Sequence, residues 1–214
     1  MPTRKQADAV LKVLRSLYPA ADCSLMYRSP LELLIATMLS AQCTDVQVNK
    51  VTPALFAKYR CAEDFAAAPI EELESSIRTT GFFHNKAKNI RGACLAIIQH
   101  FGGNVPDSMD ALVSLPGVGR KTANVVLSDA FGINAGFVVD THVFRISRRL
   151  GLAKGSTPEK VEQELCRQFK ADDWGYLSHA LIQFGRGICT ARNPKCGECL
   201  LKSCKERLQK RTGH

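Results

Sequence analysis

The chain has 214 residues and is 45% hydrophobic, so it can bury a sizeable core without disulfides as staples. Lys and Arg number 29 against 20 Asp and Glu, and the formal net charge of +9 favours a polyanionic partner such as nucleic acid. The longest apolar stretch, residues 31–41, is too short and too interrupted to cross a bilayer, which argues against a membrane-spanning protein.

Residues 1–20 lack the unbroken apolar run of a signal peptide and have the pattern of an amphipathic helix. A disulfide framework is typical of short secreted chains with an even number of cysteines, whereas this chain is long and has nine. We therefore expect a soluble protein from a reducing compartment. Five cysteines are scattered along the chain and are expected to pack in the core: Cys23, Cys43, Cys61, Cys94 and Cys166.

Apolar residues recur at helical spacing through nearly the whole chain, which predicts an all-α fold. After the N-terminal helix, the segments with this pattern are 30–42, 44–59, 70–83, 86–103, 106–115, 120–132, 140–151, 157–169 and 174–189. Asp107 is expected to cap the helix that buries Met109, Leu112 and Val113. Residues 135–140 are the only strand-like run, and no linker, repeat or low-complexity segment interrupts the chain.

Residues 115–123, LPGVGRKTA, form a tight turn between two of these helices. Gly117 and Gly119 allow positive φ angles and the close approach of another backbone. Bare N–H groups in the turn and at the next helix start would make an anion site, which grips a sugar-phosphate backbone without reading bases. The plain alternative is a packing turn. A P-loop is disfavoured because Arg120 separates the glycine from the lysine and no strand precedes the turn.

Arg120 and Lys121 stand at a helix start, where the macrodipole is least favourable to cations. Lys121 has three possible roles: a solvated surface residue, a phosphate clamp or a nucleophile. The neighbouring Arg120 and the helix dipole both disfavour the charged ammonium, and an uncharged amine can attack carbon. On the residues alone, the clamp and the nucleophile both remain open.

Asp140 follows an apolar run, so its carboxylate should be only partly exposed. It can be an ordinary N-cap, which is the commoner role of such a residue. It can also act with the hairpin lysine in cleaving a glycosidic bond. In that role the carboxylate stabilises a developing oxocarbenium ion while Lys121 attacks the anomeric carbon.

Four further cysteines crowd together with the spacing C-x6-C-x2-C-x4-C: Cys189, Cys196, Cys199 and Cys204. Four such thiolates can hold zinc or a [4Fe–4S] cluster, and the spacing lacks the two separated knuckles of a zinc ribbon. Arg192 and Lys195 lie in the first gap. They can face phosphates, or they can belong to a solvated basic loop.

Taken as a set, these motifs resemble the endonuclease III family of DNA glycosylases over about residues 5–206. Residues 115–127 resemble its helix-hairpin-helix and residues 138–152 its catalytic aspartate segment; residues 33–45, residues 81–90 and the terminal cysteines match as well. The resemblance implies a six-helix barrel with the hairpin over residues 24–134. It also implies a discontinuous iron–sulfur cluster domain over residues 1–23 and 135–214.

The resemblance implies a bifunctional DNA glycosylase and AP lyase that acts on oxidised pyrimidines and abasic sites in duplex DNA. Lys121 matches the family's Schiff-base lysine and Asp140 its essential carboxylate. The lesion is flipped out, the lysine displaces the base at C1′, and β-elimination breaks the strand 3′ to the site. A monomer associated with the nucleoid in a prokaryotic cytoplasm is implied, with no membrane partner.

The resemblance also implies that the four terminal cysteines hold a [4Fe–4S] cluster with a structural role. The family usually has five residues in the last gap where this chain has four, so Cys204 is the ligand most affected. Gln42 and Phe82 match positions that fill the gap left by a flipped base. Their plain alternatives are a polar residue at a helix end and a core aromatic. Lys86 can contact phosphate or be a solvated helix lysine.

Three rival functions fit the motifs less well. The adenine-removing glycosylase of the same superfamily needs a catalytic Glu where Ala36 stands, lacks the Schiff-base lysine and usually carries an additional C-terminal domain. A non-catalytic DNA-binding module would use the hairpin and the cysteines only to grip phosphates. A ferredoxin-like electron carrier would leave the hairpin unexplained.

Overall fold

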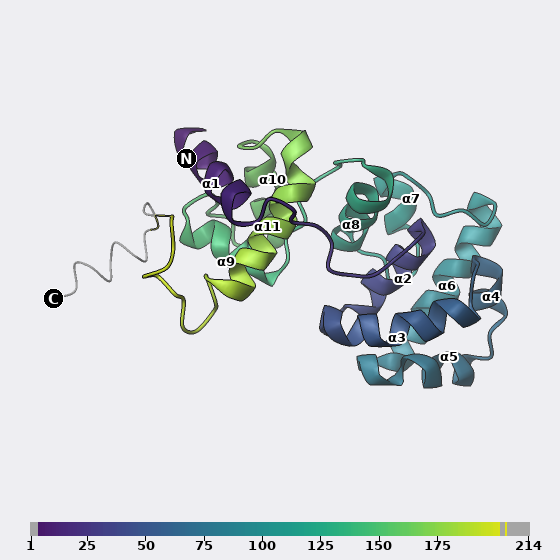
Figure 1. The fold of residues 1–214 in the computed structure, drawn as a ribbon. Coiled ribbons are helices and arrows are strands. Elements are labelled where there is room, and N and C mark those ends of the chain that lie inside the picture. Colours follow the sequence, from purple (N-terminus) through teal and green to yellow (C-terminus); the bar gives the residue numbers. More distant parts are fainter. Residues whose placement is uncertain (1–3, 202–203, 205–214) are drawn as a thin grey trace. The chain divides into compact units, whose positions relative to one another are not determined.

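The computed structural model describes residues 4–201 and Cys204, and all regular secondary structure within them is helical, so the predicted all-α class is confirmed (Figure 1). The α-helices are α1 (Arg4–Leu17), α2 (Pro30–Leu39), α3 (Asp45–Lys58), α4 (Ala62–Ala67), α5 (Ile70–Ile77), α6 (Phe83–Phe101), α7 (Met109–Val113), α8 (Arg120–Phe131), α9 (Thr141–Arg149), α10 (Pro158–Cys166) and α11 (Trp174–Gly187). Two 3-10 helices are η1 (Arg78–Thr80) and η2 (Ala171–Asp173).

The chain divides into two compact units. Residues 23–133 form the first, which we call the hairpin unit, and residues 1–22 with 134–214 form the second, the cysteine unit. No helix in the described residues is long and apolar enough to cross a membrane.

Helix α2 is the centre of the hairpin unit. All seven residues of Leu33–Leu39 are buried, and α2 packs against α3, α6 and α8 (Figure 1). The Ser29 hydroxyl accepts the Glu32 N–H, and Pro30 occupies the first helical position, so the start of α2 is well defined. Because α2 is enclosed by other helices, the chain that leaves it after Leu39 starts from a fixed point.

The periphery of the hairpin unit departs from the sequence expectations in two places. The sequence pattern did not predict α4, whose six residues are too few to show a helical period, although Phe65 is buried against Tyr59 with ring centroids 4.9 Å apart. The helix expected over residues 70–83 is interrupted: α5 ends at Ile77, η1 follows, and Gly81 turns the chain with a φ of 71°.

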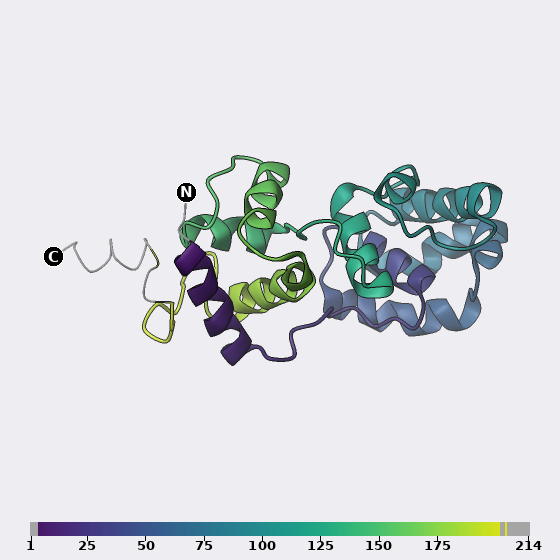
Figure 2. The ribbon, with the colours of Figure 1, turned by 90° about the horizontal axis from the view of Figure 1, so that it is seen from above.

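The cysteine unit packs α1 and α9 against α11, while α10 contacts α9 (Figures 1 and 2). The amphipathic pattern of α1 is confirmed, because Ala7, Val10 and Leu14 are buried on one face. The strand-like run 135–140 forms no strand. It is a single extended segment whose buried side chains, Phe137 to Val139, join the helical core, and residues 4–201 contain no strand that could pair with it.

A buried serine holds this segment in place. The Val138 N–H donates to Ser178 Oγ at 3.0 Å, and the Ser178 hydroxyl donates to the Trp174 carbonyl at 2.7 Å. Since Val138 lies two residues before Asp140, this pair of bonds fixes the backbone that leads into α9.

Replacing Ser178 by Ala should destabilise the cysteine unit by about 1–3 kcal/mol, because the buried Val138 N–H would lose its acceptor. Urea unfolding followed by the fluorescence of Trp174 measures the change, because this residue is the one tryptophan of the chain and lies in the same unit. The exposed Ser156→Ala variant is the control and should unfold like the unmodified protein. Equal midpoints for the two variants would contradict the assignment.

Candidate functional site

The predicted hairpin is present as α7, a tight turn over residues 114–119, and α8. Leu115 and Val118 are buried and anchor the turn, and the Val118 N–H donates to the Leu115 carbonyl. The cap of α7 is Ser108, whose hydroxyl accepts the Ala111 N–H, so the expectation that Asp107 caps the helix is wrong by one residue.

The apolar residues of α7 were also partly misassigned. Leu112 is buried, but Met109 is only half-buried and Val113 is 41% exposed. A helix of five residues can turn only a narrow face toward the core, so its remaining apolar side chains stay near the surface.

The two glycines of the turn serve different purposes. Gly117 has a φ of 75°, and a Cβ added there would lie 2.7 Å from the Asn89 Cβ on α6, so the fold itself requires a glycine. Gly119 has an ordinary φ of −95°, and a Cβ added there would meet nothing within 4 Å. The packing of the hairpin unit therefore explains Gly117 and leaves Gly119 free to admit a group from outside the chain.

The start of α8 is left open toward solvent. Gly119 provides no side-chain cap, and the first turn contains no acidic residue. Both Arg120 and Lys121 are exposed, and Lys121 forms no salt bridge with a described carboxylate. Uncapped N–H groups beside two cations form an anion site, and they leave the Lys121 amine accessible for covalent chemistry.

Asp140 is the N-cap of α9. Its Oδ1 accepts the Val143 N–H at 2.8 Å, and the residue is half-buried behind the apolar run that precedes it. The prediction that Asp140 is an N-cap is therefore confirmed. The capping hydrogen bond occupies one carboxylate oxygen and fixes the side chain, so it is compatible with a catalytic role for the other oxygen.

Gln42 and Phe82 share an unusual backbone. They are the two non-glycine residues with positive φ in the described chain, at 53° and 50°. Both are exposed, Phe82 to 63%, so the expectation of a core aromatic is wrong for Phe82. A left-handed backbone is unfavourable for every residue that carries a side chain, and such conformations concentrate at functional sites.

Lys86 is neither a solvated lysine nor placed to contact a phosphate. It is 6% exposed, and its Nζ donates to the Leu39 carbonyl at 2.7 Å and to the Thr80 carbonyl at 2.8 Å. Burial lowers the pKa of the Lys86 amine, and the nearby Cys43 opposes that shift. Because α6 begins at Phe83, Lys86 lies on the buried face of this helix, where it reaches the end of α2.

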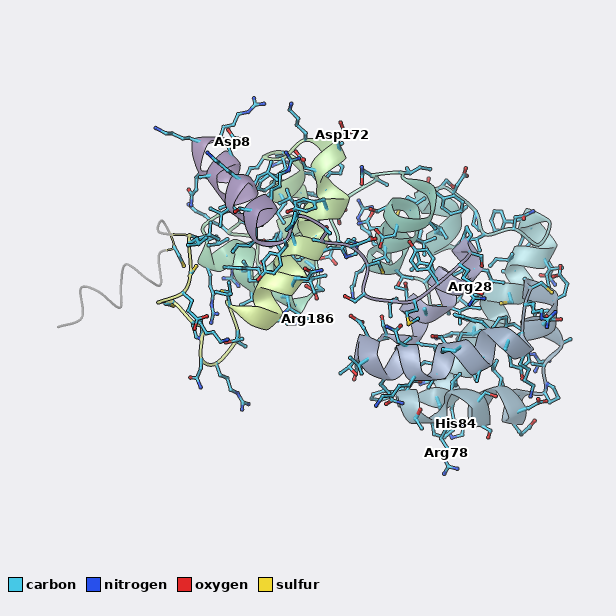
Figure 3. The ribbon with its side chains drawn as sticks, in the orientation of Figure 1. Asp8, Arg28, Arg78, His84, Asp172 and Arg186 are labelled. Carbon is cyan, nitrogen blue, oxygen red and sulfur yellow. The ribbon has the colours of Figure 1, made fainter. Side chains whose placement is uncertain are left out.

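The residues that follow Phe82 make contacts of their own at the start of α6. The Arg78 guanidinium lies over the Phe83 ring at 5.9 Å, and the rings of Phe83 and His84 are 4.1 Å apart. His84 Nδ1 lies 2.8 Å from a Glu74 carboxylate oxygen. Figure 3 shows Arg78 and His84 next to each other at the edge of the hairpin unit where α5 and α6 meet.

The four terminal cysteines line one small cavity in the cysteine unit. The short last gap still brings Cys204 to this cavity, where it is buried like Cys189. No group of three or more His, Cys, Asp or Glu residues in the described chain is placed to hold a metal ion, and the four cysteines share the lining of this cavity. A donor set of four thiols around a common space fits an iron–sulfur cluster.

Two arginines of α9 brace the chain around the first of these cysteines. Arg149 donates to the carbonyls of Thr190 and Ala191 at 2.7 and 3.0 Å, and Arg145 donates to the Cys189 carbonyl at 2.9 Å. Burial raises the pKa of the Cys189 thiol, and the Arg149 guanidinium opposes that rise. The sequence interpretation missed this brace because its partners lie about 40 residues apart.

Arg192 and Lys195 are exposed in the same loop, a position that suits either of their two interpretations. The five scattered cysteines are not all core residues. Cys94 is buried and Cys61 is exposed, while the other three are half-buried. Cys61 lies at the start of α4, the helix that the sequence pattern did not reveal.

Two family models match the chain. The model described as the HhH-GPD superfamily base excision DNA repair protein matches residues 35–171, which contain the hairpin and Asp140. The iron-sulfur binding domain of endonuclease III matches residues 189–203, which contain the first three of the four clustered cysteines.

Individual proteins are similar over nearly the full chain. Endonuclease III of Synechocystis sp. is 54% identical over 202 residues, which cover 94% of this chain and 92% of that protein. A non-covalent Endonuclease III–DNA complex has a TM-score of 0.94 and 46% identity, and the match covers 99% of both chains. A trapped Endonuclease III–DNA covalent intermediate, an estranged-adenine complex, gives the same two values over 99% of this chain and 100% of that one.

The two turn glycines should respond differently to Ala. Gly117→Ala should destabilise the hairpin unit by about 1–3 kcal/mol, because it combines a left-handed backbone with a clash against Asn89. Gly119→Ala should cost less, about 0.5–1 kcal/mol, because its new methyl group meets nothing and only the preference of the N-cap position for glycine over alanine opposes it. Thermal unfolding measures both, and a larger loss for Gly119→Ala would refute the division of roles.

Proposed function

Because this chain belongs to the endonuclease III family of the HhH-GPD superfamily, we propose that it removes oxidised pyrimidines from duplex DNA with Lys121 as nucleophile and Asp140 as the stabilising carboxylate. Its activity is that of a base excision repair DNA N-glycosylase with AP lyase activity. The observation that carries the proposal is the open start of α8, where an exposed lysine stands beside uncapped N–H groups and an unobstructed Gly119.

The proposed reaction begins when the target nucleotide leaves the base stack. The Lys121 amine attacks C1′, and the base departs with the electron pair of the glycosidic bond and takes up a proton. Opening of the sugar ring gives an iminium ion between C1′ and Nζ. Loss of a C2′ proton then expels the 3′ phosphate, which breaks the strand by β-elimination, and water releases the lysine.

Asp140 supports this reaction through its charge. As bond breaking runs ahead of attack, positive charge develops on the sugar, and a carboxylate stabilises that charge. The hydrogen bond from the Val143 N–H holds one carboxylate oxygen, so the side chain meets the charge without first having to be ordered.

The DNA duplex is held by its backbone and opened by side chains. Gly117, Gly119 and Arg120 present N–H groups and a cation to the phosphates near the lesion. Gln42 and Phe82 enter the space that the extruded nucleotide leaves, and their exposed, left-handed positions support that role. Arg192 and Lys195 add phosphate contacts from the cysteine unit.

The chain binds a [4Fe–4S] cluster. We assign Cys189, Cys196, Cys199 and Cys204 as its ligands, since all four line one cavity. When bound, the cluster would join these four residues by thiolate ligation and so tie the loop after α11 to the core of the cysteine unit, and base removal needs no electron from it. The cysteine unit is thus proposed as the cluster domain and the hairpin unit as the six-helix barrel.

Oxidised pyrimidines and abasic sites in duplex DNA are the proposed substrates, and a monomer in the bacterial cytoplasm, associated with the nucleoid, is the proposed form. The net charge of +9 supports a partner as acidic as the chromosome. Ala36 is buried within α2, at the position where the adenine-removing relatives need a glutamate. The lack of a carboxylate at this position supports removal of oxidised pyrimidines over removal of adenine.

Lys121→Gln should abolish covalent trapping on abasic duplex DNA in the presence of borohydride, because reduction needs the imine that the amine forms. Gel shift should still detect binding of the same duplex within about threefold, since the backbone contacts remain. Arg120→Gln is the matched control, and it should still be trapped. A non-catalytic DNA-binding module would show no trapping even in the unmodified protein, and trapping of Lys121→Gln would assign the imine to another amine.

Arg149→Met should lower the iron bound per chain, because the loop from Cys189 to Ala191 loses the two hydrogen bonds that brace it. Absorbance at about 400 nm and iron analysis report the cluster. The control is Arg148→Met, at the neighbouring exposed arginine that lies over the Phe144 ring. Equal iron contents in the two variants would show that the Arg149 hydrogen bonds do not support cluster binding.

A further inference from the structure

A buried ammonium connects the ends of α2 and η1, the two elements that precede Gln42 and Phe82 in the chain. Lys86 reaches inward from the first turns of α6, and its two hydrogen-bond acceptors are main-chain carbonyls. No salt bridge within residues 4–201 involves it. A buried cation without a carboxylate partner is expensive in free energy, so the two carbonyls must compensate for much of the lost hydration.

Both acceptors lie at helix ends. Leu39 is the last residue of α2, and Thr80 is the last residue of η1. Carbonyls at such ends lack partners within the helix. One ammonium therefore satisfies two helix ends that lie about 40 residues apart in the sequence, and it is favoured there over a neutral donor because charge-assisted hydrogen bonds are stronger.

The exposed residues follow these ends closely. Gln42 comes three residues after Leu39, and Phe82 comes two residues after Thr80. The Lys86 N–H also donates to the Phe82 carbonyl at 3.1 Å, so this lysine is bonded to both segments and to one of the two exposed residues directly. A separate hydrogen bond, from Gln47 Nε2 on α3 to Thr79 Oγ1 on η1 at 2.8 Å, is exposed to water.

We propose that Lys86 is a positioning residue, whose ammonium joins the segment after α2 to the segment after η1 and so sets the separation of Gln42 and Phe82 for entry into one gap in the duplex. This inference rests on the function proposed above. Two strained, exposed residues cannot hold their own conformation, because a left-handed backbone costs roughly 1–2 kcal/mol per residue. The buried ammonium supplies an anchor that water and salt weaken much less than they weaken an exposed contact.

The test compares Lys86→Met with Lys88→Met in the full chain. Methionine keeps an unbranched apolar stem of similar length but has no donor, whereas Lys88 is exposed on the same helix and serves as the matched control. If Lys86→Met does not fold, Lys86→Gln, which keeps N–H donors without the charge, replaces it.

Two substrates separate positioning from chemistry. Single-turnover excision from a duplex that contains an oxidised pyrimidine requires the gap to be filled. Strand cleavage of a single-stranded abasic oligonucleotide requires the Lys121 chemistry without an opposite strand. We expect Lys86→Met to slow the first reaction by about ten- to a hundredfold and the second by less than about twofold. Lys88→Met should match the unmodified protein in both.

Equal losses on the two substrates would overturn the proposal, because they would indicate general damage to the fold. An unchanged duplex rate in Lys86→Met would overturn it as well. If the unmodified protein cleaves neither substrate, the proposed function fails instead, so the two failures can be told apart.

A double-mutant cycle gives a readout that a purely structural role would not move. In a Gln42→Ala, Phe82→Ala background, replacement of Lys86 by Met should slow duplex excision by less than about twofold further, because nothing is left to position. If the losses multiply instead, Lys86 acts independently of those two residues and the proposal fails.

Discussion

Every helix ends with backbone groups that the helix itself cannot satisfy, and the way this protein meets that requirement determines its site. At the start of α9 the Val143 N–H donates to the Asp140 carboxylate. At the ends of α2 and η1 the last carbonyls accept hydrogen bonds from the ammonium of Lys86. At α8 the chain supplies no side-chain cap, and that helix start carries Lys121. Three helix ends are thus served from within the chain, and the open one is where we place the phosphate.

In the cysteine unit, side-chain hydrogen bonds support a segment that lacks regular secondary structure. Its last described stretch, from Cys189 onward, contains no regular helix or strand, so backbone bonds alone give it little support. Arg145 and Arg149 donate to consecutive carbonyls of this stretch, and Cys189, Leu201 and Cys204 join the helical core of the unit. The arginines and the proposed cluster ligation therefore act on the same few residues, and Arg149 lines the cavity that the four cysteines share.

Features that depend on neighbouring residues could be predicted from the sequence. The all-α class, the amphipathic α1 and the hairpin with its two glycines follow from local spacing, and the structure contains each of them. Features that depend on distant contacts could not be predicted. The sequence suggests a surface lysine at position 86, because the carbonyl on α2 that accepts its hydrogen bond lies 47 residues earlier. The strand-like run 135–140 is apolar because helices enclose it, and an apolar run alone does not distinguish a strand from a buried segment.

The cysteine unit is assembled from two distant pieces of the chain, and this affects how the protein is made. The whole hairpin unit, residues 23–133, is synthesised between α1 and the rest of the unit to which α1 belongs. At about 5–20 residues per second, α1 is synthesised roughly 8–30 seconds before α11, the helix that packs against it. During that interval the apolar face that carries Val10 and Leu14 lacks this partner and is available to other apolar surfaces.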